Sequence, residues 1–237
     1  MDIPGFGQEG QEKLRNTTAL VSRTGGLGGP IALQLAAAGI GKLVLAHGGN
    51  LQPSDLNRQV LMRHGSLGQP RIESARETLQ AFNPHITVET VNANINEENA
   101  EELVGSADIV FDAAPRFNER FLLNRQCVRQ RKSLIDAAMF SMEGQVVTIV
   151  PGLTPCLACL YPEEPPHWNR RFPVLGAVSS LIANIAVVQG ICLLTGIGDA
   201  HLGKMIYIDT AGMNLRKIAI QRRIDCAVCQ SVPSAAP

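Results

Sequence analysis

Four of the six cysteines form two Cys-x-x-Cys pairs, Cys156 with Cys159 and Cys226 with Cys229. Each pair can offer two thiolates to one metal ion, and two pairs complete the tetrahedral shell of four sulfurs that zinc prefers. Because such a shell leaves no open position, the pattern predicts a structural zinc site that joins the start of the long C-terminal segment to its end. The alternative interpretation is redox-active dithiols, since one Cys-x-x-Cys pair can be thioredoxin-like.

A glycine-rich loop follows the first apolar run of the chain and precedes a helical pattern. Backbone N–H groups of such a loop, and the positive end of the helix behind it, attract a phosphate, and glycines permit its close approach. Arg23 stands where the first glycine of the G-x-G-x-x-G template belongs, but the second and third glycines are present. The loop comprises Gly25, Gly26, Leu27 and Gly28.

Two polar residues end predicted strands near this loop. His47 follows the second strand, where a nicotinamide dinucleotide site needs an acid for the ribose hydroxyls, so this type of oxidoreduction is not expected. His47 either donates a hydrogen bond to a ribose or is a surface histidine. Asp112 ends the fourth strand, beside the first, at the edge where doubly wound sheets bind ligands. It either binds magnesium through a nucleotide or caps the next segment.

Composition bounds the class of protein. The chain has 237 residues, of which 45% are hydrophobic, and a formal net charge of zero. It can therefore bury a full core, and nothing in its charge favours nucleic acid or an anionic membrane as partner. The N-terminus has no basic start followed by an apolar run, and polar residues interrupt the apolar stretch 174–194, so we expect a cytoplasmic protein with no membrane span.

Hydrophobic periodicity predicts alternating strands and helices in the first half of the chain. The expected strands are 17–21, 42–46, 86–91, 108–112 and 133–138, and the expected helices are 29–38, 56–62, 70–82, 97–104 and 117–131. A strand at 146–150 follows too soon for a crossover helix and should pair antiparallel. A proline-containing loop at 162–168, a long helix at 174–195 and strands at 204–209 and 215–220 complete the chain.

This order predicts an α/β fold with a doubly wound, mostly parallel Rossmann-like sheet and antiparallel C-terminal strands. We expect one nucleotide-binding domain over residues 1–237, with an N-terminal segment at 1–16 and a flexible tail at 231–237.

The motifs together resemble the E1-like adenylyltransferases of the ThiF/MoeB/HesA family. The resemblance rests on the glycine loop, then Ser54-Asp55-Leu56-Asn57-Arg58-Gln59, then Pro70-Arg71, and then the two cysteine pairs, in this order along nearly the whole chain. It implies a homodimeric, ATP-binding fold with a four-cysteine zinc. It also implies the use of ATP and Mg²⁺ to adenylate the C-terminal glycine of a ubiquitin-like protein that later receives sulfur.

The resemblance also implies roles for individual residues. Arg58, Arg71 and Asp112 take the catalytic roles, with Arg71 in place of a phosphate-binding lysine. Nucleotide binding is implied for the glycine loop with His47, Asp55, Arg58, Gln59 and Arg71. Asp55 stands where the family usually has asparagine, and His47 replaces the ribose-binding aspartate.

Other positions depart further from the family pattern. Pro115 occupies the place of an aspartate that serves magnesium and catalysis, and proline cannot ligate a metal. Phe172 lies where thioester-forming members have cysteine, so we expect no covalent thioester with a carrier protein. The family's N-terminal segment, whose arginine reaches the ATP of the partner subunit, has no counterpart in this sequence.

Several stretches, among them Arg116-Phe117-Asn118-Glu119-Arg120, look most like the HesA branch, which is associated with nitrogen fixation and metallocluster maturation. Two hypotheses follow. The first is an adenylyltransferase that acts on a sulfur-carrier protein or another acid in sulfur or molybdenum cofactor biosynthesis. The second is an E1-like scaffold without turnover, in metallocluster maturation, that binds a nucleotide, a metallocluster-assembly protein or molybdate.

Overall fold

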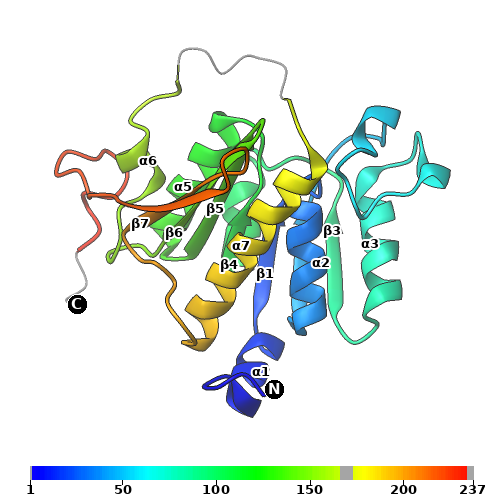
Figure 1. Cartoon of the computed structure of the whole chain (residues 1–237), viewed down its shortest axis with the longest axis horizontal. Coiled ribbons are helices and arrows are strands. Elements are labelled where there is room, and N and C mark those ends of the chain that lie inside the picture. Colours follow the sequence, from blue (N-terminus) through cyan, green and yellow to red (C-terminus); the bar gives the residue numbers. More distant parts are fainter. Residues whose placement is uncertain (1, 166–172, 234–237) are drawn as a thin grey trace.

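A computed structural model describes residues 2–165 and 173–233 as one eight-stranded sheet with helices on both faces (Figure 1). The strand order is β3-β2-β1-β4-β5-β6-β7-β8. Strands β3, β2, β1, β4 and β5 pair in parallel, and β5 to β8 pair antiparallel. The expected fold class is confirmed. The strands are β1 (Thr18–Ser22), β2 (Lys42–Ala46), β3 (Thr87–Val91), β4 (Ile109–Asp112), β5 (Ser133–Phe140), β6 (Glu143–Ile149), β7 (Lys204–Asp209) and β8 (Asn214–Ala219).

The helices connect these strands and cover the sheet. They are α1 (Gly7–Arg15), α2 (Gly28–Ala38), α3 (Arg71–Phe82), α4 (Ala100–Gly105), α5 (Phe117–Gln130), α6 (Leu157–Leu160) and α7 (Gly176–Thr195). Two single 3-10 turns, Pro53–Asp55 and His64–Ser66, lie between β2 and α3. Helix α1 lies within the N-terminal segment for which the sequence predicted no element.

The central strands are apolar on both faces because both faces are covered. Ala19 and Val21 of β1 pack in one core with α2, α3 and α7, whereas Leu20, between them, packs in a second core with α4 and α5. Successive side chains of a strand point to opposite faces of the sheet, so alternate residues enter different cores when helices cover both faces. β1 lies between β2 and β4, so the chain reverses its winding at the carboxyl ends of β1 and β4. This reversal creates the crevice in which such sheets bind ligands.

The antiparallel half begins with the hairpin between β5 and β6. Ser141 turns the chain with a left-handed φ of 57°, and Phe140 pairs directly with Glu143. Strand β6 therefore begins before the predicted residue 146, because pairing continues up to the turn. Every residue of the edge strand β8 is exposed.

Helix α7 is mostly apolar, and within residues 2–165 and 173–233 it is the one helix long and apolar enough to cross a membrane. It packs on α2 and on β5 and β6. Its inward residues, including Ile182, Ala183 and Ala186, are fully buried in the core. The predicted long helix at 174–195 is thus present, and its face toward the sheet is a core face.

The predicted helix at 56–62 is wrong. This segment follows the 3-10 turn Pro53–Asp55 as a series of turns that bury Leu61 and Met62. Seven residues are too few to nucleate a helix without support. Hydrogen bonds to the Asp55 carboxylate stabilise the turns instead of a helix. This carboxylate accepts from the backbone N–H of Gln52 at 2.9 Å and from Arg71.

Part of the predicted proline-containing loop, residues 166–168, lies outside the described residues, as do Phe172 and residues 234–237 of the predicted tail.

Candidate functional site

The glycine loop lies between the end of β1 and the start of α2, as predicted. Gly28 begins α2, and a Cβ at this position would lie 1.8 Å from the carbonyl oxygen of Arg23. A Cβ on Gly26 would lie 3.1 Å from both Arg58 Cδ and Ser179 Oγ. Gly28 is therefore required by the packing of the loop backbone, and the absence of a side chain at Gly26 lets the loop lie close to the cationic side chain of Arg58.

Arg23 adopts the backbone conformation that the missing first glycine would favour. Its φ is 66°, which is left-handed and unusual for a residue with a side chain. The side chain turns toward α5, where Nε donates to Glu119 at 2.9 Å, and it also contacts Asn94. The Arg23–Glu119 ion pair holds the loop in place, so the turn is kept although the template residue is lost.

His47 is buried behind the loop as a neutral ring. The backbone N–H of Thr24 donates to Nδ1 at 3.0 Å, so the ring proton lies on Nε2. Burial first, and then the charges of Arg23 and Arg71, lower the pKa of His47 to about 3. The surface-histidine alternative is excluded, because His47 is 7% exposed and lines the cavity. An aspartate at this position would accept hydrogen bonds from a ligand, whereas the Nε2–H of His47 can donate one.

Asp55 brings Arg58 and Arg71 together. Arg71 donates to Asp55 Oδ2 from Nε at 3.0 Å and from Nη2 at 2.6 Å. Arg58 Nη2 lies 3.4 Å from Oδ1 of the same carboxylate. Gly49 has a left-handed φ of 87°, and a Cβ there would meet Arg71 Nη1 at 2.8 Å. A neighbour in the same turn, Arg58, and a residue of the next helix, Arg71, thus converge on one carboxylate.

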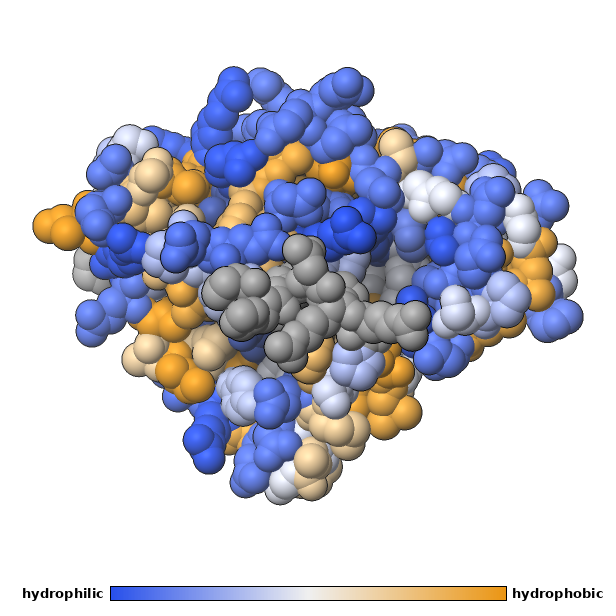
Figure 2. All heavy atoms as spheres, turned by 90° about the horizontal axis from the view of Figure 1, so that it is seen from above, coloured by the Kyte–Doolittle hydropathy of each residue, from blue (hydrophilic) through white to orange (hydrophobic). Residues whose placement is uncertain are grey.

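These groups line a cavity of about 430 Å³ at the carboxyl ends of β1 and β2. Figure 2 views this edge of the molecule, where hydrophilic side chains predominate. Eight of the nine predicted binding residues line the cavity, and Gly28, which begins α2, is the exception. The eight are Gly25, Gly26, Leu27, His47, Asp55, Arg58, Gln59 and Arg71. Gln59 is buried, and its Oε1 has no hydrogen-bond partner, so an acceptor is available to a ligand.

Asp112 ends β4 next to β1, as predicted, but its side chain is fully buried behind the cavity. Its Oδ1 accepts hydrogen bonds from Ser22 Oγ at 3.0 Å and from the backbone N–H of Ala114 at 2.8 Å. Arg120 is committed to Asp136, with Nη2 2.7 Å from Oδ2, and its Nε lies 3.9 Å from Asp112 Oδ2. Burial first, and then the charge of Asp136, raise the pKa of Asp112 to about 8.

Sequence reasoning did not identify the buried Arg120–Asp136 pair or the partnership of Arg23 with Glu119. A signal for the first was present, since Asp112 and Asp136 are in-register neighbours on adjacent parallel strands. Two buried acids at one sheet edge require a cation nearby. No comparable signal pointed to Glu119, because the loop and α5 meet only in the folded chain.

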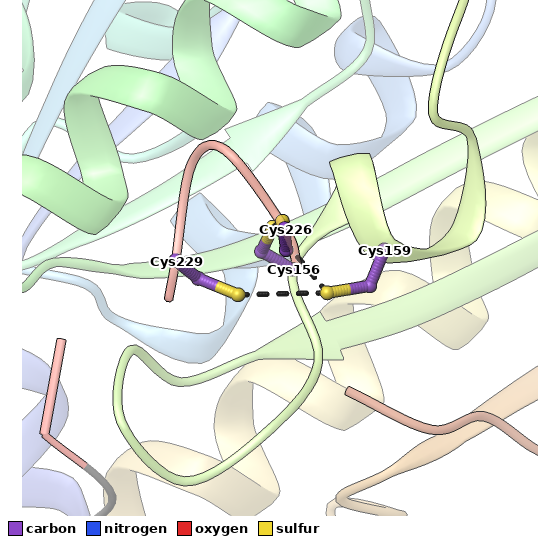
Figure 3. Close-up of side chains that lie close together, drawn as sticks. All are labelled: Cys156, Cys159, Cys226 and Cys229. Carbon is purple, nitrogen blue, oxygen red and sulfur yellow. Dashed lines mark hydrogen bonds between the residues drawn. The ribbon is translucent and has the colours of Figure 1, made fainter. Parts of the chain in front are cut away.

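The four predicted cysteines form one cluster, with all four Sγ atoms within 4.8 Å of one another (Figure 3). Cys156 and Cys159 lie at the start and within α6, and Cys226 and Cys229 come from the C-terminal turn (Figure 1). The Sγ–Sγ separations are 3.6 Å between Cys156 and Cys226 and 3.5 Å between Cys159 and Cys229. A tetrahedral shell with Zn–S bonds of about 2.3 Å requires S–S separations of about 3.8 Å, so the cluster fits zinc.

Comparisons with known proteins agree with this architecture. The model of the ThiF family matches residues 1–228. The chain is 47% identical over 230 residues to Protein HesA of Nostoc sp. (strain PCC 7120), covering 97% of this chain and 91% of that protein. It is 32% identical over 243 residues to the sulfur carrier protein adenylyltransferase of Thermus thermophilus, covering 99% and 90%. Escherichia coli MccB with MccA-N7isoASN has a TM-score of 0.83 at 25% identity, covering 93% of this chain and 69% of that chain. The chain belongs to the ThiF family.

Proposed function

We propose that this protein binds ATP and adenylates a carboxylate on a second protein. The observation that carries the proposal is the cavity in which the glycine loop, Arg58 and Arg71 face one another beside a ring donor from His47. A phosphate chain suits the loop N–H groups and the two guanidinium groups. The family relatives named as adenylyltransferases support the reaction class.

In the proposed reaction, a carboxylate oxygen of the acceptor attacks the α-phosphorus of ATP. The new O–P bond forms as the bond from the α-phosphorus to its β-bridging oxygen breaks, and pyrophosphate leaves with that electron pair. The chain itself supplies positioning and cationic stabilisation of the phosphates through Arg58 and Arg71. The Nε2–H of His47 and the unpartnered Gln59 Oε1 can orient the nucleoside.

Magnesium, when bound with ATP, would neutralise charge on the phosphates. Among the described residues that line the cavity, Asp55 is the one carboxylate, and Arg71 already engages it. The Asp112 carboxylate predicted for this role is buried, with a pKa raised to about 8. The cavity therefore does not present an uncommitted carboxylate for the metal, and we assign no step to it.

The acceptor would enter through a second cavity of about 190 Å³ that shares Arg120, Ala138 and Met139 with the first. Aromatic side chains, including Tyr161 and Tyr207, line it. A slender C-terminal tail fits a groove of this size, so we propose a ubiquitin-like sulfur-carrier protein, in sulfur or molybdenum cofactor biosynthesis, as the acceptor. A metallocluster-assembly protein, in a pathway linked to nitrogen fixation, is the alternative acceptor that the resemblance to the HesA branch implies.

Titration calorimetry with ATP and Mg²⁺, followed by pyrophosphate exchange with candidate carrier proteins, tests the function. We expect ATP binding in the wild type, loss of binding in Arg71→Ala, and little effect of Arg129→Ala. Arg129 is a matched control because it is an exposed arginine that pairs with Glu101 far from the cavity. No ATP binding at millimolar concentration would refute the proposal.

The second candidate function is a scaffold that does not turn over ATP. Two observations favour it: Asp55 is already paired with Arg71, and Pro115, which cannot ligate a metal, lines the cavity. If it is correct, the wild type binds nucleotide but shows no pyrophosphate exchange, and the double change His47→Asp with Pro115→Asp creates exchange. Rapid exchange by the wild type would exclude this function.

We further propose that the cysteine cluster holds structural zinc. A bound ion would tie α6 to the C-terminal turn, which the sequence places 70 residues further along the chain. The cluster is buried and complete without an external ligand, so its expected contribution is to stability.

We also propose a homodimer built on α7. Its outward face presents Ala177, Leu181, Asn184 and Val188 as exposed residues at helical spacing, and Val188 is 55% exposed. Three of these four residues are apolar, and a stripe of this spacing packs well against the same stripe of a second copy, because two-fold association places like surfaces together.

A further inference from the structure

We propose that Asp55 is an internal counter-anion that sets the charge of the phosphate subsite. This inference rests on the proposed function, since it concerns the arginines that would hold the phosphates of ATP. The Asp55 carboxylate contacts both Arg58 and Arg71, the two guanidinium groups that would hold a phosphate. A bound phosphate chain then shares the two guanidinium groups with a fixed negative charge.

The contacts of Asp55 support this role. Oδ2 accepts from Arg71 Nε at 3.0 Å and from Nη2 at 2.6 Å, so two N–H groups that a guanidinium can offer to a phosphate are directed at this one carboxylate oxygen. Oδ1 lies 3.4 Å from Arg58 Nη2. The backbone N–H of Gln52 donates to Oδ2 at 2.9 Å, so the carboxylate is fixed by the main chain as well as by its cationic partners.

Burial strengthens the electrostatic interactions of Asp55 and Arg71. The side chain of Asp55 is 7% exposed and that of Arg71 is 16% exposed, so solvent screens the pair less than it would screen a surface ion pair. Asp55 is the one carboxylate among the cavity-lining residues that the structure describes. With two guanidinium groups and one carboxylate, the subsite formed by Asp55, Arg58 and Arg71 has a net charge of about +1 rather than +2, by simple addition of unit charges.

A fixed negative charge among phosphate-binding groups discriminates by ligand charge. It repels triphosphate more than diphosphate, and diphosphate more than phosphate, because the repulsion grows with the charge brought close to it. Asp55 therefore weakens the hold on a triphosphate chain and eases the departure of pyrophosphate. Asparagine has the same shape and can still accept a hydrogen bond from Arg71, but it carries no charge.

The test is calorimetric binding of inorganic triphosphate, pyrophosphate and phosphate to Asp55→Asn and to the wild type. Buffer and ligand solutions are freed of divalent metals beforehand on a chelating resin, so that no chelator contacts the protein. We expect triphosphate to bind at least about tenfold more tightly to the variant, with a smaller gain for pyrophosphate and the smallest for phosphate. Glu101→Gln is the matched control, because it removes one exposed acid that pairs with an arginine elsewhere, and it should leave all three affinities unchanged.

The outcomes separate this inference from the proposed function. Tighter triphosphate binding by Asp55→Asn without any ATP binding would support the counter-anion and reject the adenylation proposal. Equal or weaker triphosphate binding by Asp55→Asn, or no binding by either protein, overturns the counter-anion role. If Asp55→Asn does not fold, as judged by circular dichroism, the neutral variant Asp55→Ser takes its place with the same expected order. A gain for Glu101→Gln equal to that for Asp55→Asn would show a general charge effect and also overturn the proposal.

Discussion

Replacing Asp112 by asparagine should change how the stability of the protein depends on pH. Asp112 is fully buried, and its Oδ2 has no hydrogen-bond partner. It shares Arg120 with Asp136, but Arg120 makes its direct hydrogen bonds to Asp136. Two buried carboxylates therefore face one guanidinium, and the less favoured of the two, Asp112, has a pKa raised to about 8 by burial and by the charge of Asp136.

The sign and size of the effect follow from linkage. The ordinary pKa of an aspartate is 3.8, so between pH 4 and pH 8 the folded chain holds a proton on Asp112 that the unfolded chain has lost. The stability from this proton is fully present below the unfolded pKa and is lost as the pH rises through the folded pKa. One proton changes the free energy of unfolding by about 1.4 kcal/mol per pH unit. The wild type should therefore lose about 2 kcal/mol from this group between pH 6 and pH 8.

Urea denaturation at pH 6, 7 and 8, at constant ionic strength, measures this change. Asp112→Asn should lack it, because an amide stays neutral, so the difference in stability between variant and wild type should shift by about 2 kcal/mol in favour of the variant over this range. Asp199→Asn is the control, since Asp199 is exposed and its pKa is lowered, so it stays ionised throughout. Parallel curves for Asp112→Asn and the wild type would refute the assignment of the proton to Asp112.

Three further predictions concern packing, metal and assembly. Gly28→Ala should destabilise the fold by about 2 kcal/mol or more in urea denaturation, because the new Cβ would meet the Arg23 carbonyl oxygen at 1.8 Å; a negligible change would contradict the loop geometry. Mass spectrometry of metals should find one zinc per chain, and Cys226→Ser should lose the zinc and lower the Tm; full zinc content in that variant would exclude the site. Val188→Glu should convert a dimer to a monomer in light scattering, whereas Phe82→Glu, at an equally exposed apolar position on α3, should not; a dimer in both would refute the α7 interface.

The sequence alone determined the elements and motifs that depend on local pattern. The strand at Lys42–Ala46 has the predicted bounds, and the antiparallel pairing at β6 follows from the short connection after β5. The cysteine pairs were readable because a metal shell needs a fixed number of sulfurs at short spacing, and the structure brings all four together. Periodicity and spacing are properties of neighbouring residues, so they are visible in the chain without its fold.

The burial and the ion-pair partners of the polar residues around the cavity depend on the tertiary structure. The sequence placed Asp112 at the correct sheet edge, but its burial depends on Arg120 and Asp136, which belong to another helix and another strand. The sequence likewise placed Asp55 near Arg58, but the pairing of Asp55 with Arg71 arises where the turn meets α3. Whether a charged group faces a ligand, a partner or the core is fixed by groups far away in the chain, because desolvation and charge pairing act through space.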